Sequence, residues 1–142
     1  MTYDPVETIS IKNTTTLTQV ERIVVHILSH PERIWWFAGD FMQPRLSNEH
    51  PHYVGYEASA RLTDALSMFN QPEAELFETK KDGKFRMVAI NWREFENCLK
   101  VYPRLIKLAE LTDIMSRFDG LKDRVNEYKP KEKKKVTFKS YG

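Results

Sequence analysis

The sequence predicts a mainly α-helical fold that carries one small β-hairpin. Residues 18–29 and 56–69 each repeat apolar side chains at the spacing of an amphipathic helix. Residues 75–90 are rich in β-forming side chains on either side of Asp82-Gly83, a pair typical of tight hairpin turns. With 142 residues, 41% of them hydrophobic, the chain is long enough to bury a core without a disulfide or a metal.

The first helix is predicted from Thr18 to Ser29. Thr18 and Glu21 have the spacing of a capping box, in which the hydroxyl and the carboxylate each accept a backbone N–H at the helix start. Pro31 is expected to end this helix, because the residue before a proline avoids helical backbone. Residues 1–15 read as an extended lead-in.

The middle of the chain predicts two further helices separated by a loop. Residues 33–42 hold two tryptophans and two phenylalanines, which favours a compact, buried second helix. Residues 43–52 are polar and contain two prolines, which is typical of a loop. The third helix is predicted from Tyr56 to Phe69, and Pro72 prevents it from continuing.

Residues 93–128 are predicted to form a C-terminal helical segment. Its main helix begins at Pro103, whose missing N–H is harmless in a first turn, and a shorter stretch links it to the hairpin. The apolar residues of this helix follow 3-4-3 spacing, which favours either packing on the preceding domain or pairing with a second copy in a homodimer. These residues are Leu108, Leu111, Met115 and Phe118.

Three helices followed by a basic hairpin resemble the winged helix-turn-helix superfamily, which includes many bacterial and phage regulators. The resemblance covers residues 16–92. It rests on the helix Thr18–Ser29, the aromatic segment Trp35–Met42, the helix Tyr56–Phe69 and the hairpin segment Leu76–Arg86. It implies that the third helix enters the major groove of double-stranded DNA, and that the hairpin, or wing, contacts phosphates or the minor groove.

The resemblance also implies which side chains contact the DNA. One side of the third helix would face the bases, and Arg61 would reach a phosphate from the flank. Cations around the hairpin turn would be the wing contacts. The base-facing residues are Tyr56, Ser59, Ala60, Thr63 and Ser67, and the wing residues are Lys80, Lys81, Lys84 and Arg86.

The end of the chain concentrates positive charge. Residues 129–142 hold six lysines and one glutamate, whereas the whole chain has a formal net charge of +2. Such a segment is expected to be a flexible tail. It either neutralises DNA phosphates without reading their sequence, with Lys133, Lys134 and Lys135 as contacts, or serves only as a solubilising terminus.

Two acidic residues in the third helix depart from the DNA-binding pattern. Glu57 and Asp64 would repel a phosphate backbone at short range. They leave a second hypothesis open, in which the winged domain is a protein–protein interaction module or an inhibitor that docks through an acidic helix face.

Four histidines suggest a metal site on spacing alone. His26 and His30 are four residues apart on a helix, and His50 and His52 lie in the predicted loop. No glutamate follows His26, so the metalloprotease motif is absent. We interpret the four as ordinary surface and helix-end residues and predict no bound metal.

Nothing else in the sequence predicts catalysis or a cofactor. Glu78-Thr79-Lys80 matches the E-x-K fragment of metal-dependent nucleases, but no second acid stands on a predicted neighbouring strand. Cys98, the single cysteine, lacks an evident catalytic framework and is expected to be a small buried residue. We therefore predict a non-enzymatic protein.

The sequence also bears on compartment and role. No apolar run approaches the ~20 residues of a membrane span, and residues 1–5 lack the basic start and apolar core of a signal peptide. A single cysteine excludes an intrachain disulfide. We expect a cytoplasmic DNA-binding protein without a membrane partner, which regulates transcription or a phage-like genetic element as a dimer.

Overall fold

The computed structural model describes residues 17–127 as a mixed assembly of helices and short antiparallel strands. Its five α-helices are α2 (Gln19–Ser29), α3 (Ala58–Phe69), α4 (Trp92–Val101), α5 (Pro103–Glu110) and α6 (Ile114–Arg117). The strands β1 (Asn70–Gln71) and β2 (Ala74–Glu75) form one sheet, and β3 (Phe77–Asp82) and β4 (Phe85–Ile90) form the other. Three 3-10 helices complete the set: η1 (Ala38–Phe41), η2 (Gly55–Glu57) and η3 (Phe118–Gly120).

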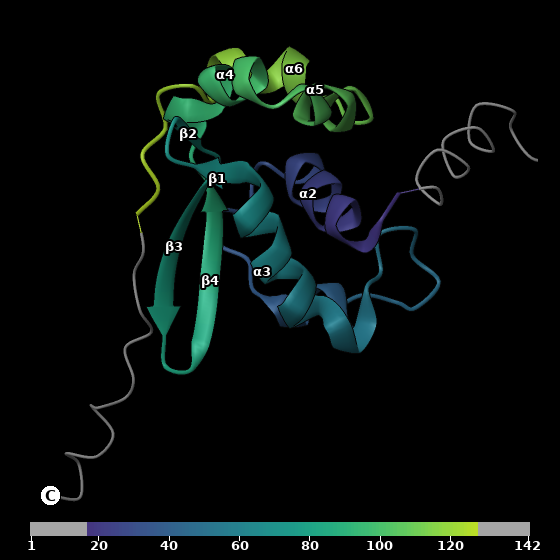
Figure 1. Cartoon of the computed structure of the whole chain (residues 1–142). Helices are drawn as coiled ribbons and strands as arrows, with labels where there is room; N and C mark the ends of the chain where they lie inside the picture. Colours follow the sequence, from purple (N-terminus) through teal and green to yellow (C-terminus); the bar gives the residue numbers. More distant parts are fainter. Residues whose placement is uncertain (1–16, 128–142) are drawn as a thin grey trace, which may run out of the picture.

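The helices form two groups, and the long hairpin projects from them (Figure 1). Helices α2 and α3 pack against each other, and α5 packs on α2. Helices α4, α5 and α6 lie together across one end of the molecule, and the β3–β4 hairpin runs from that end alongside α3 (Figure 1). The tip of the hairpin therefore stands away from the α4–α6 group.

The start of α2 confirms the predicted capping box. The Thr18 hydroxyl accepts the Glu21 N–H at 3.2 Å, and the Glu21 carboxylate accepts the Thr18 N–H at 3.0 Å. The helix ends at Ser29, as Pro31 predicts. Glu21 is buried and also pairs with Arg104 of α5. One carboxylate thus caps α2 and joins it to the C-terminal helices.

The compact helix predicted for residues 33–42 is wrong. The backbone of Trp36 is paired with Val88 of β4, donating its N–H and accepting the Val88 N–H, both at 2.8 Å. Only Ala38–Phe41 form a helical turn, the 3-10 helix η1. Aromatic side chains suit a strand as well as a buried helix, and the open edge of β4 supplies the hydrogen bonds that select the extended form.

The third helix and the hairpin agree with prediction, with small shifts. Tyr56 lies in η2 rather than in α3. The hairpin register runs from Phe77 opposite Ile90 to Asp82 opposite Phe85, so its turn is Gly83-Lys84, one residue later than the predicted Asp-Gly centre. Gly83 has a φ of 65°, the left-handed conformation that glycine adopts without strain.

The C-terminal segment is more broken than predicted. Residues expected to link the hairpin to a helix form the helix α4. The helix that begins at Pro103 ends at Glu110, because the Thr112 hydroxyl donates to the Ala109 carbonyl and accepts the Ile114 N–H. Side-chain hydrogen bonds of this kind compete with helical ones, and a separate short helix, α6, follows.

This break divides the predicted apolar stripe. Leu108 is buried in the core, and Phe118 is partly buried against Phe95. Leu111 and Met115 are exposed. The four residues therefore do not form one continuous face. A single straight helix would have placed them on one face.

The hydrophobic core is one cluster that includes side chains from both sides of the predicted boundary between residues 92 and 93. Val24, Leu62 and Phe69 belong to it, and so do Leu105 and Ile114 of the C-terminal helices. In the range 17–127, no helix combines the length and the apolar character needed to cross a membrane. The predicted lead-in and the Lys-rich tail lie outside the described residues.

Candidate functional site

The exposed side of α3 and the turn end of the hairpin form the two walls of a groove. A cavity of about 300 Å³ lies between them, lined among others by Ser59 and Thr63 of α3 and by Lys84 and Arg86 of the hairpin. The Arg86 guanidinium donates to the Thr63 hydroxyl at 2.6 Å. We call the surface that these four residues line the hairpin–helix groove. Two cations and two hydroxyls therefore converge there.

All five residues predicted to face bases are exposed. Tyr56 is 87% exposed and lies just ahead of α3. Ser59, Ala60, Thr63 and Ser67 are exposed along α3, whereas Leu62, Ala65 and Phe69 are buried on its other side. The free face of α3 thus carries short side chains, mostly hydroxyls, that would let the helix backbone approach another surface closely.

The hairpin concentrates cations near its tip. Lys80, Lys81 and Lys84 are exposed, and Arg86 is half-buried. Lys81 lies directly opposite Arg86 in the strand register, an arrangement of like charges that destabilises a sheet unless an anion lies nearby. In the part of the chain that the structure describes, Lys81, Lys84 and Arg86 form no ion pair.

Arg61, predicted to reach a phosphate, is held along its own helix instead. Its guanidinium lies 3.3 Å from the Asp64 carboxylate and 3.9 Å from that of Glu57. The two acids that depart from the DNA-binding pattern are therefore both next to one arginine. Lys133, Lys134 and Lys135, the other predicted contacts, lie outside the described residues.

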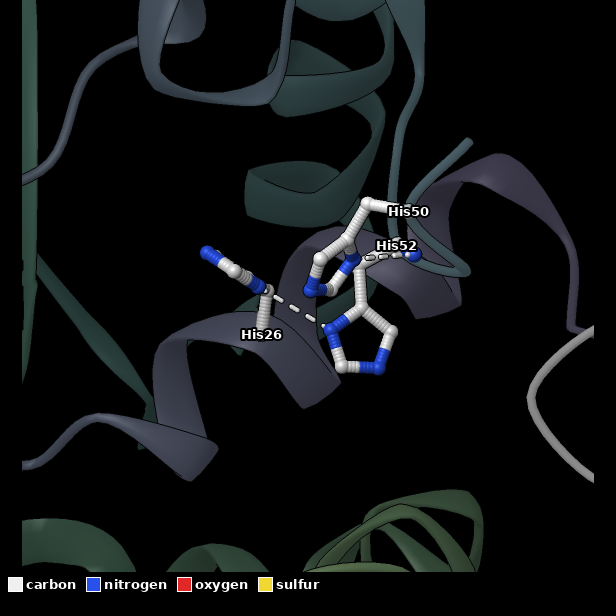
Figure 2. A group of neighbouring side chains, drawn as sticks. All are labelled: His26, His50 and His52. Atoms are coloured by element: carbon white, nitrogen blue, oxygen red, sulfur yellow. Dashed lines mark hydrogen bonds between the residues drawn. The ribbon is translucent and has the colours of Figure 1, made fainter. Parts of the chain in front are cut away.

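A second cluster, of histidines, lies between α2 and the loop that connects η1 to η2 (Figure 2). His26 comes from α2, and His50 and His52 come from the loop between η1 and η2. The Nδ1 atoms of His26 and His52 are 3.0 Å apart, and one ligand nitrogen from each of the three rings lies within 4.8 Å of the others. His26 and His52 are 7% and 9% exposed. We call His26, His50 and His52 the histidine cluster.

The histidine cluster is electrically neutral at pH 7. Burial first, and then repulsion from neighbouring histidines and from Arg33 or Arg22, lower the pKa of His26 to about 3 and that of His52 to about 4. Burial also lowers the pKa of His50. Each ring then keeps one nitrogen with a free lone pair, the form that binds a metal ion.

The structure differs from the prediction that these histidines are ordinary polar surface residues. His26 packs edge-on against Trp36 and Phe41, so the predicted surface position is wrong for this ring. His30 is half-exposed and lies 3.4 Å from Glu32, so it resembles the helix-end histidine that was predicted. The His-x-His spacing of residues 50 and 52 was the available signal, but spacing could not place that loop against α2.

Two other candidate residues, Glu78 and Cys98, lie in surroundings that serve the fold. The Glu78 carboxylate accepts the Asn126 amide at 3.0 Å, and the same amide donates to the Ile90 carbonyl at 2.7 Å. Cys98 is fully buried, and burial raises the pKa of its thiol to about 12. The thiolate that a nucleophile requires is therefore suppressed at neutral pH.

We compared the chain with models of protein families, with curated proteins and with solved structures, and none of them matches it.

Proposed function

We propose that this chain is a non-enzymatic protein that binds double-stranded DNA in the manner of a winged helix-turn-helix domain and regulates transcription or a phage-like element. The order of elements supports the proposal. Helix α2, the turn η1 and helix α3 precede the β3–β4 hairpin, which is the order that the resemblance requires, with η1 in place of a full second helix.

The hairpin–helix groove is the observation that carries the proposal. An α-helix about 10–12 Å across fits a major groove about 12 Å wide. The exposed hydroxyls of Ser59 and Ser67 can donate to or accept from base edges, whereas that of Thr63 accepts from Arg86 and donates to the Ser59 carbonyl. Lys84 and Arg86 border the same cavity as Ser59 and Thr63 of α3. If α3 lay in the major groove of DNA, these cations would lie near the adjacent phosphates.

The distribution of ion pairs supports an anionic partner at the hairpin. Arg33 and Arg45 share the Asp40 carboxylate, and Arg104 pairs with Glu21. The hairpin cations Lys81, Lys84 and Arg86 have no such partner within residues 17–127, and two of them face each other across the strands. Phosphates would relieve that repulsion, and the bound lysine and arginine side chains would release counterions from the DNA.

The alternative, docking of a protein on an acidic face of α3, has less support. Glu57 and Asp64 flank Arg61, which offsets part of their charge. The hydroxyl-bearing side of α3 turns instead toward the basic hairpin.

The proposal is tested by fluorescence anisotropy with labelled random duplex DNA over a series of salt concentrations. We expect binding that weakens steeply with salt, because each phosphate contact contributes about 0.9 to the slope of log K against log salt. The double variant Lys81→Ala/Lys84→Ala should weaken binding and reduce this slope by about 1–2.

The matched control removes the same charge elsewhere. Lys100 of α4 and Lys107 of α5 are exposed and lie outside the hairpin–helix groove. Lys100→Ala/Lys107→Ala should leave the slope almost unchanged. No measurable duplex binding at low salt would refute the proposal, and equal losses in both variants would remove the hairpin from it.

A further inference from the structure

We propose that His26, His50 and His52 form a binding site for one divalent transition-metal ion of the zinc type. The site is independent of the proposed DNA-binding surface. It joins a helix to a loop that lies more than twenty residues away in the chain, and its three side chains point toward one another (Figure 2).

The spacing of two of the three nitrogens is close to what zinc requires, and the third would have to move closer. Two ligands that each lie roughly 2.0–2.1 Å from a tetrahedral Zn²⁺ are about 3.3 Å apart. The Nδ1 atoms of His26 and His52 are 3.0 Å apart, so a metal could sit between them after a small opening of the pair. Without a metal, one of these nitrogens must carry a proton that it donates to the other. When Zn²⁺ binds both Nδ1 atoms, that proton moves to Nε2 of the same ring, so both imidazoles stay neutral.

The third ring would join through a change of tautomer. The Nδ1 atom of His50 accepts the backbone N–H of His52 at 2.9 Å, so the neutral ring holds its proton on Nε2. Figure 2 shows Nε2 on the side of the ring that faces His26 and His52. Coordination through Nε2 moves the proton to Nδ1, and the hydrogen bond from the His52 N–H is given up. The metal must therefore change the environment of that amide.

The ligand set selects the class of metal. Three neutral imidazoles suit zinc and its transition-metal neighbours, whereas Mg²⁺ and Ca²⁺ require oxygen ligands. Arg22 and Arg33 lie close enough to act electrostatically on these histidines and would oppose a cation. Arg22 donates to the Tyr53 carbonyl, and Arg33 donates to the Asp40 carboxylate. We therefore expect micromolar affinity rather than the tighter binding of a thiolate site.

The cluster has solvent beside it. Of the three ligands, His26 lines a cavity of about 390 Å³, whose other walls include His30, Asp40 and the cations Arg33 and Arg45. An ion or a water molecule could therefore approach the cluster from the His26 side. A bound ion would fasten residues 50–52 to α2 and so restrain the loop that leads into η2 and α3.

The test titrates the full chain, made without a polyhistidine tag and stripped with a chelator, with Zn²⁺ in a calorimeter. A parallel titration follows the visible absorption of Co²⁺. We expect one ion per chain, a tetrahedral Co²⁺ spectrum, and no binding of Mg²⁺. His50→Ala, which replaces a half-buried ring, should weaken Zn²⁺ binding by more than the roughly 100-fold seen for residues that only support a ligand.

The matched control is His30→Ala, since His30 contacts the ring of His26 but lies outside the histidine cluster. It should bind Zn²⁺ as the unmodified chain does. Far-UV circular dichroism checks the fold of each variant. If His50→Ala does not fold, amide NMR of the unmodified chain decides the question: Zn²⁺ should shift the His52 resonance. An absence of saturable binding, binding unchanged in a folded His50→Ala, or shifts confined to His30 and Glu32 would each overturn the site.

Discussion

Asp40 provides the sharpest test of the packing around η1. Its carboxylate is 2% exposed and accepts three donors. Oδ2 accepts the Phe37 N–H at 2.8 Å and the Arg33 guanidinium at 2.7 Å, and Oδ1 accepts Arg45 at 3.3 Å. Asp40→Asn preserves the shape of the side chain, but it removes the charge and turns one acceptor into a donor.

The expected loss can be worked out bond by bond. Hydrogen bonds that involve a charged group are worth about 1.5–3 kcal/mol and neutral ones about 0.5–1.5 kcal/mol, so the two bonds at Oδ2 each lose about 1 kcal/mol. The Arg45 side chain is 57% exposed and can return to water, so its bond adds only about 0–1 kcal/mol. The free energy of unfolding should therefore fall by about 2–3 kcal/mol, and Tm by about 8–12 °C for a chain of this size.

The assay is thermal and urea unfolding followed by circular dichroism. The matched control is Asp113→Asn, because that carboxylate is 66% exposed and 3.9 Å from Arg117. It should change stability by less than about 0.5 kcal/mol. If Asp40→Asn proves as mild as Asp113→Asn, the buried carboxylate does not hold η1 in place and the reasoning above is wrong.

Three further predictions concern the C-terminal half. Tyr102→Phe should lower the free energy of unfolding by about 1–3 kcal/mol, because the hydroxyl accepts the Gln71 N–H and donates to the Ala74 carbonyl; a neutral result in urea unfolding would contradict this. Cys98 should not react with a thiol reagent at mildly alkaline pH until denaturant is added, because its pKa is raised to about 12; rapid reaction of the native chain would show that it is accessible. If two copies pair through the exposed end of the C-terminal helices, the unmodified chain sediments as a dimer and Leu111→Glu/Met115→Glu as a monomer, whereas an unmodified monomer would exclude pairing.

Local signals in the sequence predicted the elements that depend on neighbours in the chain. The capping box at Thr18 and the turn glycine at position 83 act within a few residues, so their patterns are sufficient. The exposed side of α3 followed from helical periodicity alone. Helix α3 and the hairpin supply the four residues of the hairpin–helix groove.

The misses have other origins. Two of them depend on a partner far away in the chain, and one depends on side-chain hydrogen bonds that compete with the helix locally. Trp36 is extended because Val88 offers it two hydrogen bonds. The helix after Pro103 stops where the Thr112 hydroxyl bonds the backbone of Ala109 and Ile114, although the apolar spacing of the sequence continues. The histidine cluster forms because a loop without regular structure folds back on α2, and no periodicity encodes that contact.

Trp36 occupies an unusual mechanical position. Its backbone is hydrogen-bonded to Val88 of β4, while its indole ring packs against His26, with ring centroids 5.4 Å apart. The base of the basic arm and the imidazole trio therefore share one rigid residue. A displacement of the arm, or a widening of the imidazole trio around an ion, would therefore shift Trp36, and a shift of Trp36 would be felt at both places.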